Sequence, residues 1–239
     1  MEKDFAKLYP GDNTFNLKSR IVKAKKIIAV VRDYKKSLSK LSCLDYGCSI
    51  GLMTNYFASV FKNVVGVDVD NKAITKARIK YNENNLRFKI ITNEKLPCTN
   101  DSFDVIVFNQ VYEHMDCPEL AIREIFRVLK PGGVCYFGAR NKYFPIDGHY
   151  LIPFIAYLPK GVSDFIFKYL LGRKSYDIKL YSLGGLRKLT KKFRIIDYTL
   201  AVFKNPVKFH LNSNLRFLSP FAKIFYFLIP NYMWLLVKP

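Results

Sequence analysis

The chain has 239 residues, half of them hydrophobic, and its 39 Lys and Arg against 19 Asp and Glu give a formal net charge of +20. This length and apolar content can bury a full core, so we expect one domain over residues 1–239. The charge favours an anionic partner such as nucleic acid, acidic lipid or a phosphorylated substrate. The sequence shows no signal-peptide pattern and no window of about 20 uninterrupted apolar residues, so we expect neither secretion nor a membrane-spanning helix.

The first predicted element is a basic amphipathic helix in the N-terminal region, residues 1–40. Apolar residues recur at helical spacing from position 16 onward, with lysine and arginine on the other sides. Strand-like and helix-like runs then alternate, which is typical of a parallel sheet covered by helices on both faces. Predicted strands are 41–45, 63–68, 86–91, 103–109 and 132–139, and predicted helices are 49–61, 71–85 and 117–130.

The last hundred residues are less regular. The pattern predicts a helix over 182–193, a strand over 194–203 and a final strand over 232–238. Two aromatic and basic segments, 140–180 and 205–230, read as insertions. The five cysteines form no C-x-x-C pair and lie mostly in apolar runs, which favours buried free thiols and a reducing cytosol.

The sequence GCSIG at Gly47–Gly51 is open to two common interpretations. As G-x-S-x-G it matches the nucleophile elbow of serine hydrolases, but only one helix precedes it and no oxyanion loop lies upstream. As a dinucleotide loop, G-x-G-x-x-G, it fails at Ser49 and Leu52.

What remains is a strand ending in Asp45, a turn of small residues and a second strand ending in Asp68. Glycines let the backbone approach a ligand, and an acid on the second strand can accept hydrogen bonds from a ribose diol. The arrangement therefore suits a nucleoside without a pyrophosphate.

Four motifs in order, LDYGCSIG, VVGVDVD, NEKLPCTNDSFDVIVFNQVYEHM and FRVLKPGGVCYFG, resemble those of class I S-adenosylmethionine-dependent methyltransferases of the methyltransferase-11 type. The resemblance covers about residues 40–140. It implies a Rossmann-like, doubly wound, seven-stranded, mostly parallel sheet with helices on both faces. It also implies S-adenosyl-L-methionine as the cofactor.

The resemblance assigns roles to individual residues. Asp45, Gly47, Ser49 and Gly51 would hold the methionine part of the cofactor. Asp68 would take the ribose hydroxyls, with Val69 beside it. The adenine position falls on Thr92, Asn93 and Glu94, and Asn109 and Gln110 would line the methyl-transfer site at the end of the fourth strand.

Two positions depart from the family pattern. Ser49 stands where glycine is usual, and either adopts an awkward backbone angle or uses its hydroxyl on the ligand. Thr92 replaces the usual adenine-binding acid, although a hydroxyl, or the amide of Asn93, can still meet the adenine edge.

A general base is needed only for a poorly acidic acceptor oxygen. The candidates are His149 and His114, and each has a structural alternative. Glu113 and His114 resemble a pair found in quinone-type O-methyltransferases, sometimes with a divalent metal, but Gln110 stands where those enzymes have another acid. We therefore predict no metal site.

The acceptor must be inferred from the two insertions, which combine aromatic and aliphatic residues with sparse lysine and arginine. They suit either lid packing or a hydrophobic tunnel or membrane-interface surface. We favour O-methylation of a small or lipid-like acceptor by a cytoplasmic enzyme with possible peripheral contact to anionic membrane. The alternatives are an RNA methyltransferase, for which no appended RNA-binding module is evident, and a non-catalytic cofactor-binding partner subunit.

Overall fold

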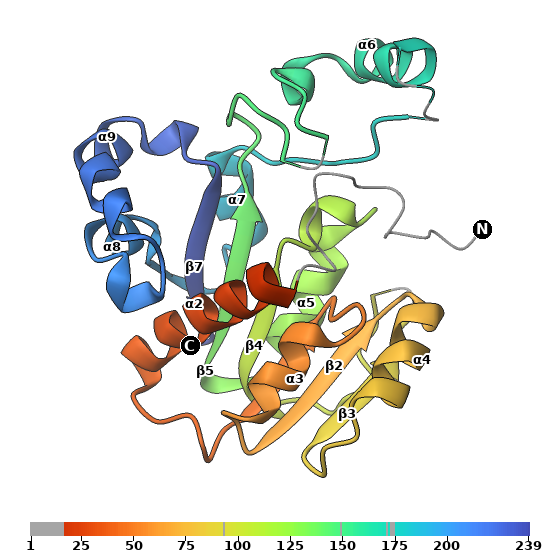
Figure 1. Ribbon diagram of the computed structural model, residues 1–239. Helices are drawn as coiled ribbons and strands as arrows, with labels where there is room; N and C mark the ends of the chain where they lie inside the picture. Colours follow the sequence, from red (N-terminus) through yellow and green to blue (C-terminus); the bar gives the residue numbers. More distant parts are fainter. Residues whose placement is uncertain (1–16, 93, 149, 171, 173–174) are drawn as a thin grey trace.

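A computed structural model describes residues 17–239 except 93, 149, 171, 173 and 174 (Figure 1). Its centre is a seven-stranded sheet in the order β3-β2-β1-β4-β5-β7-β6. The strands are β1 Ser42–Tyr46, β2 Asn63–Asp68, β3 Leu86–Ile90, β4 Phe103–Asn109, β5 Leu129–Arg140, β6 Arg194–Asp197 and β7 Asn231–Val237. The predicted seven-stranded Rossmann-like sheet is confirmed.

Six strands run in one direction, and β7 runs antiparallel to both of its neighbours. The strand order reverses between β1 and β4, where ligands bind in open α/β sheets, outside the carboxyl ends of the strands. We call this side of the sheet the carboxyl edge.

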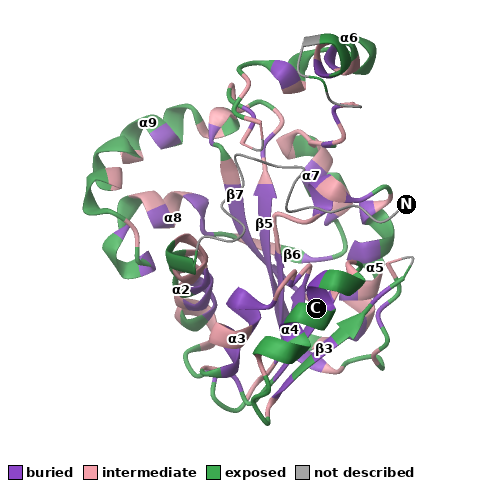
Figure 2. Cartoon of the chain, turned by 45° about the vertical axis from the view of Figure 1, so that its right-hand side comes forward, coloured by how far each residue is buried: buried purple, intermediate pink, exposed green. Residues whose placement is uncertain are grey.

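Helices cover both faces of the sheet (Figure 2). Along β4 the side chains alternate, with Val105 and Val107 in the core under one layer and Ile106 and Phe108 in the core under the other. The first layer contains α2 (Leu17–Lys35), α3 (Leu52–Ala58) and α4 (Asn71–Lys80), and the second contains α5 (Pro118–Val128) and α7 (Leu183–Leu189). This two-sided burial explains the nearly continuous apolar sequence of the central strands.

Two expectations about individual elements were wrong. The fifth strand begins earlier, at Leu129, and the Pro-Gly-Gly segment forms an irregularity within it, because Phe103 pairs with Leu129 whereas Val105 pairs with Val134. The sixth strand ends at Asp197, and residues Thr199–Lys204 form α8 instead of more strand. The Asp197 side chain accepts a hydrogen bond from the Thr199 N–H at 2.8 Å, which turns the backbone out of the sheet.

The segment 140–180, which we call the α6 segment, lies beyond the carboxyl edge (Figure 1). It contains η2 (Ile155–Tyr157), α6 (Lys160–Phe165) and the π-helical turn η3 (Ile166–Leu170). A small core of its own holds it together, formed by Ile155, Phe167, Tyr176 and Ile178. Tyr150 packs its ring against Phe167 at 4.6 Å, so this side chain belongs to that core.

The segment 205–230, which we call the α9 segment, follows α8. Its elements are η4 (Val207–Phe209), η5 (Ser213–Leu218), α9 (Ser219–Ile224) and η6 (Tyr226–Leu228). Asn141, just after β5, donates to the carbonyls of Phe227 at 2.6 Å and Ile229 at 2.9 Å. These bonds fix the end of the α9 segment to the carboxyl edge.

Within the described residues, every helix is too short or too polar to traverse a bilayer. All five cysteines are free, and Cys43, Cys48 and Cys135 are buried, as the apolar sequence around them predicts.

Candidate functional site

The loop Gly47–Gly51 connects β1 to α3 at the point where the strand order reverses. Gly47 and Gly51 have φ angles of 78° and 79°, which favour glycine. A Cβ atom on Gly47 would lie 2.6 Å from a methyl carbon of Val111, and one on Gly51 would lie 2.7 Å from the ring of Phe88. The sequence therefore needs glycine at both positions for space as well as for conformation.

Ser49 has a φ of 49°, in the left-handed region. A residue with a side chain adopts this region less readily than the glycine that is usual at this position. Its backbone N–H donates to Oδ2 of Asp68 at 2.7 Å, and the Asp70 N–H donates to Oδ1 of the same carboxylate at 3.0 Å. Burial raises the pKa of Asp68, and these backbone donors oppose the shift. Each carboxylate oxygen retains a lone pair, so Asp68 can still accept the ribose hydroxyls assigned to it.

Asp45 lies beneath the loop and is almost fully buried. The Thr54 hydroxyl donates to its Oδ2 at 2.7 Å. Burial raises the pKa of Asp45 to about 6, against the favourable effects of this hydrogen bond and of the positive charge of Arg20. A cationic group placed next to Asp45 would lower its pKa and favour the ionised carboxylate.

The adenine candidates lie between β3 and β4. Asn93 falls outside the described residues. The carboxylate of Glu94 accepts a hydrogen bond from the Tyr46 hydroxyl at 2.9 Å, so this side chain is tied to β1. Thr92 is exposed, as is Val69 after β2, and both can contact a ligand at the carboxyl edge.

Asn109 ends β4 at the carboxyl edge, and Gln110 follows it. Asn109 lies against Gly138, where a Cβ would come within 2.1 Å of its Oδ1. Gln110 has a φ of 56°, and its amide is held from both sides. Lys23 Nζ donates to its Oε1 at 3.1 Å, and its Nε2 donates to Oδ1 of Asn231 at 3.2 Å.

Sequence reasoning missed three residues here. Lys23 and Arg20 read as the polar side of the N-terminal helix, and Asn231 fell between the second insertion and the predicted final strand. The +20 charge and the helical spacing gave no sign that α2 turns these cations toward the ends of β1 and β4, because only tertiary packing brings them there.

The Glu113–His114 pair forms part of η1 (Tyr112–His114). Glu113 is fully buried, and its Oε1 lies 3.4 Å from Nε of Arg140. The structure therefore gives Glu113 a place in an ion pair between η1 and the end of β5. The described residues contain no group of three His, Cys, Asp or Glu side chains placed to hold a metal ion. His149 lies outside the described residues.

A family model described as a methyltransferase domain matches residues 44–137, the segment that carries the glycine loop, Asp68 and the end of β4. Residues 44–137 are a class I S-adenosylmethionine-dependent methyltransferase domain. Among curated relatives, the methyltransferase is 28% identical over 207 residues to the ubiquinone biosynthesis O-methyltransferase of Pelagibacter ubique, covering 81% of this chain and 82% of the relative.

Solved structures agree on the fold. The PH0226 protein of Pyrococcus horikoshii matches with a TM-score of 0.61 at 17% identity, over 99% of this methyltransferase and 97% of that chain. Phosphoethanolamine N-methyltransferase 2 of Haemonchus contortus, solved with S-adenosyl-L-methionine, matches with a TM-score of 0.56 at 19% identity, over 89% and 52% of the two chains.

S-adenosylmethionine is the cofactor of the methyltransferase. The geometry of the site suits such a ligand. The carboxyl edge brings together a loop without side chains at Gly47 and Gly51 and two acids, the buried Asp45 and the half-buried Asp68. The roles of the individual residues stay predictions.

Proposed function

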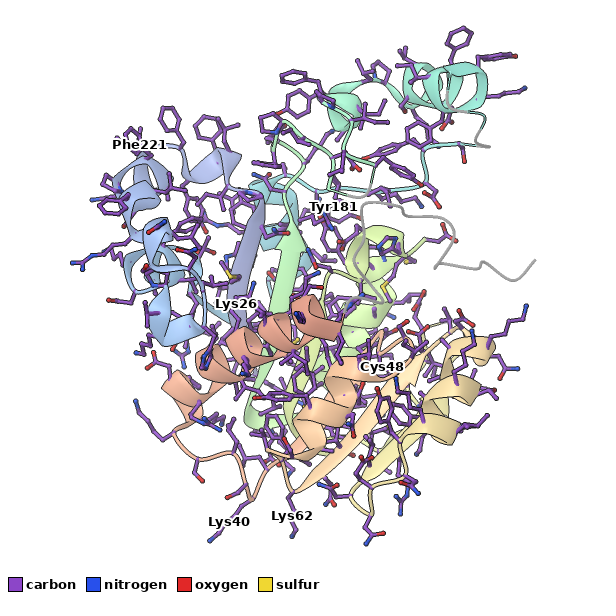
Figure 3. The ribbon with its side chains drawn as sticks, viewed as in Figure 1. Lys26, Lys40, Cys48, Lys62, Tyr181 and Phe221 are labelled. Carbon is purple, nitrogen blue, oxygen red and sulfur yellow. The ribbon has the colours of Figure 1, made fainter. Side chains whose placement is uncertain are left out.

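We propose that the methyltransferase methylates a hydroxyl oxygen of a lipid-like, amphiphilic acceptor at the carboxyl edge of β4 and β5. One observation supports this most: the edge that carries Gln110 is flanked by the α6 and α9 segments, both rich in exposed apolar side chains (Figure 3). The similarity to ubiquinone biosynthesis O-methyltransferases supports oxygen as the acceptor atom.

The chemistry asks little of the protein beyond placement. Bound S-adenosylmethionine supplies an electrophilic methyl carbon together with its leaving group. The chain has to align the acceptor oxygen with that carbon, exclude water and stabilise the charge on the oxygen as its proton leaves. In this proposal Lys23 and Gln110 contact the acceptor head group, and the ammonium of Lys23 favours the ionised oxygen.

The α9 segment carries the most exposed apolar surface. Phe217, Ile224 and Phe221 are 78%, 67% and 60% exposed, and Phe221 lies on the outer side of α9 (Figure 3). Large exposed apolar patches of this kind mark interaction sites. Residues 198–239 contain five Lys and Arg and no Asp or Glu, so the charge around this surface suits an anionic partner.

The α6 segment repeats the pattern on the other side of the carboxyl edge. Phe165 and Tyr169 are exposed, and Asp164, one of its three aspartates, is paired with Lys160 at 3.0 Å. Apolar side chains beside lysines favour contact with an anionic membrane surface. We therefore propose a cytoplasmic enzyme that meets its acceptor at a membrane and binds the membrane peripherally.

The acceptor class can be tested with 4-octylcatechol and 4-methylcatechol, which share the reacting group and differ in the tail. We expect kcat/KM to be about tenfold higher for the octyl compound, since burial of apolar surface contributes about 25 cal/mol per Å². The double variant Phe221→Ser/Ile224→Ser should lose this preference. Ile79→Ser, at an 81% exposed position on α4, is the matched control and should keep it. Equal rates for the two catechols would overturn the proposal.

Membrane contact has its own assay. We expect flotation with vesicles containing 30% phosphatidylglycerol, loss of binding in the double variant, and little binding to pure phosphatidylcholine. Failure to bind any vesicle would remove the membrane part of the proposal and leave the acceptor class untouched.

A further inference from the structure

A concave surface lies between α5 and α7, lined by none of the residues of the glycine loop. The cleft has a volume of about 650 Å³, which is within the range of small-molecule sites. Ile122, Leu180 and Leu189 contribute apolar lining, and Tyr143 and Tyr181 contribute aromatic rings. Lys142 donates its backbone N–H to the Tyr181 carbonyl at 3.3 Å, so the cleft is joined to the base of the α6 segment.

Five cations line this cleft against one acid. They come from three parts of the chain: Arg123 from α5, Lys142 from the residues after β5, and Lys188, Lys191 and Lys192 from α7 and the turn that follows. Lys192 places its Nζ over the Phe126 ring at 5.7 Å. No acidic side chain within the described residues forms an ion pair with the other four.

The nearby acids are used elsewhere. Glu119, the acid of the cleft, accepts a hydrogen bond from the Tyr181 hydroxyl at 3.1 Å. Glu124, one turn further along α5, binds Arg127 at 2.7 Å and the Leu96 N–H at 2.9 Å. Glu119 keeps its negative charge, so the five cations against this one acid leave the cleft with an excess of positive charge.

We propose that this cleft binds a ligand with a diphosphate or another multiply charged phosphate group. A single carboxylate would neutralise only one of the cations, whereas a diphosphate can engage several at once. Arg123 offers the planar donor pair that matches phosphate oxygens, and the apolar lining leaves room for an organic part. This site is independent of the acceptor proposed above.

Titration calorimetry with inorganic pyrophosphate at low salt tests the site. The variant Arg123→Gln/Lys188→Gln/Lys191→Gln is compared with Lys62→Gln/Lys76→Gln/Lys80→Gln, which removes the same charge from exposed positions around α3 and α4. We expect saturable binding to the wild type, at least tenfold weaker binding to the cleft variant, and less than a twofold change in the control. Equal losses in both variants, or no saturable binding to the wild type, would overturn the proposal.

The same assay separates a free phosphate from a lipid head group. Glycerol 3-phosphate and monomeric dihexanoyl phosphatidic acid are each titrated and then displaced with pyrophosphate. Tighter, displaceable binding of the lipid assigns the cleft to a lipid head group, and tighter, displaceable binding of glycerol 3-phosphate assigns it to a soluble ligand. Binding of both that pyrophosphate does not displace would place the anion site outside the cleft and contradict the proposal.

Discussion

The backbone N–H of Ser49 donates to the carboxylate of Asp68 over 2.7 Å, which ties the loop after β1 to the end of β2. In our assignment the Asp68 carboxylate has two roles: it holds the glycine loop in place, and it accepts hydrogen bonds from the ribose hydroxyls of the cofactor. Its substitution should therefore affect both the loop and the ligand.

Asp68→Ala should weaken S-adenosylhomocysteine binding by about 1–3 kcal/mol, the cost of leaving charge-assisted hydrogen bonds unmade. Calorimetric titration measures this loss. Asp70→Ala is the control, because Asp70 caps α4 through the Ala73 N–H at 3.0 Å and should lower stability more than affinity. Unchanged affinity in Asp68→Ala would mean that the ribose is placed wrongly.

Two substitutions at Ser49 separate strain from ligand contact. Ser49→Gly relieves the left-handed backbone, whereas Ser49→Ala keeps the strain and removes the hydroxyl. If the serine is tolerated drift, both variants should bind S-adenosylmethionine like the wild type, and the glycine variant should melt no lower. Equal loss of affinity in both would instead assign the hydroxyl to the ligand.

Asp45 should give the ligand-free protein a characteristic pH dependence. Its pKa of about 6 in the fold lies above the ordinary value of 3.8, so folding favours the protonated form. Its contribution to stability is present below pH 4 and is lost as the pH rises through 6, by about 3 kcal/mol. Urea unfolding of the wild type and of Asp45→Asn between pH 4 and 7 measures how the stability difference between them changes with pH. A stability difference that stays constant over this range would mean that the pKa of Asp45 is not raised.

Cofactor binding should show the opposite trend. If Asp45 meets the amino group of the methionine part, affinity should rise as the pH increases from 5 to 7.5, because the carboxylate then carries its charge. Asp45→Asn should bind weakly with a flat profile over this range. A wild-type affinity independent of pH would exclude this contact.

Lys23→Met should lower kcat/KM for a catechol acceptor about tenfold and leave S-adenosylmethionine affinity unchanged, in keeping with the usual gain from stabilising charge on the reacting oxygen. It should also move the acidic, ascending limb of the pH profile to higher pH, because the acceptor hydroxyl loses a neighbouring cation and its pKa rises. Lys25→Met removes an exposed lysine from the same helix and should behave as wild type. Equal effects of both variants would indicate a general charge effect.

Because Glu113 is paired with Arg140, we expect its substitution to lower the stability of the protein, and we expect no dependence of activity on a metal ion. Glu113→Ala leaves the Arg140 charge uncompensated in a buried setting and should lower the unfolding free energy by about 3–5 kcal/mol. The double variant Glu113→Leu/Arg140→Met should lose less unfolding free energy than Glu113→Ala, because it leaves no buried charge without a partner. Chelation with EDTA should leave wild-type activity unchanged, and a loss restored by magnesium would reopen a metal role for this region.

The sequence was most informative where a segment is buried on both faces. The bounds of β2 and β4 match the predicted strands to the residue, since Asn63–Asp68 and Phe103–Asn109 are apolar runs ended by polar residues. It was misleading at Thr199–Lys204, where aromatic and β-branched residues read as strand. The Met233 N–H, 34 positions away, donates to the Thr199 hydroxyl at 3.0 Å, and no local pattern contains that contact.

The site residues likewise fall into those that the sequence predicts and those that depend on tertiary packing. Loop glycines and strand-end acids follow from spacing, because parallel strands bring their carboxyl ends to one edge. The amide clamp on Gln110 does not follow, because Lys23 and Asn231 are 87 and 121 positions away from it. The same holds for the cleft between α5 and α7, whose cations come from three separate stretches.

The reversed direction of β7 has a consequence for how such an enzyme can diversify. Because β7 starts where β6 and the other parallel strands end, the chain between β6 and β7 never has to travel back along the sheet. The sheet therefore does not fix the length of this connection, and insertions or deletions in it can change the surface beside the carboxyl edge while every strand stays in register. If the α9 segment contacts the acceptor, as we propose, changes in this one connection alter acceptor preference and leave the strands β1 to β4 unchanged.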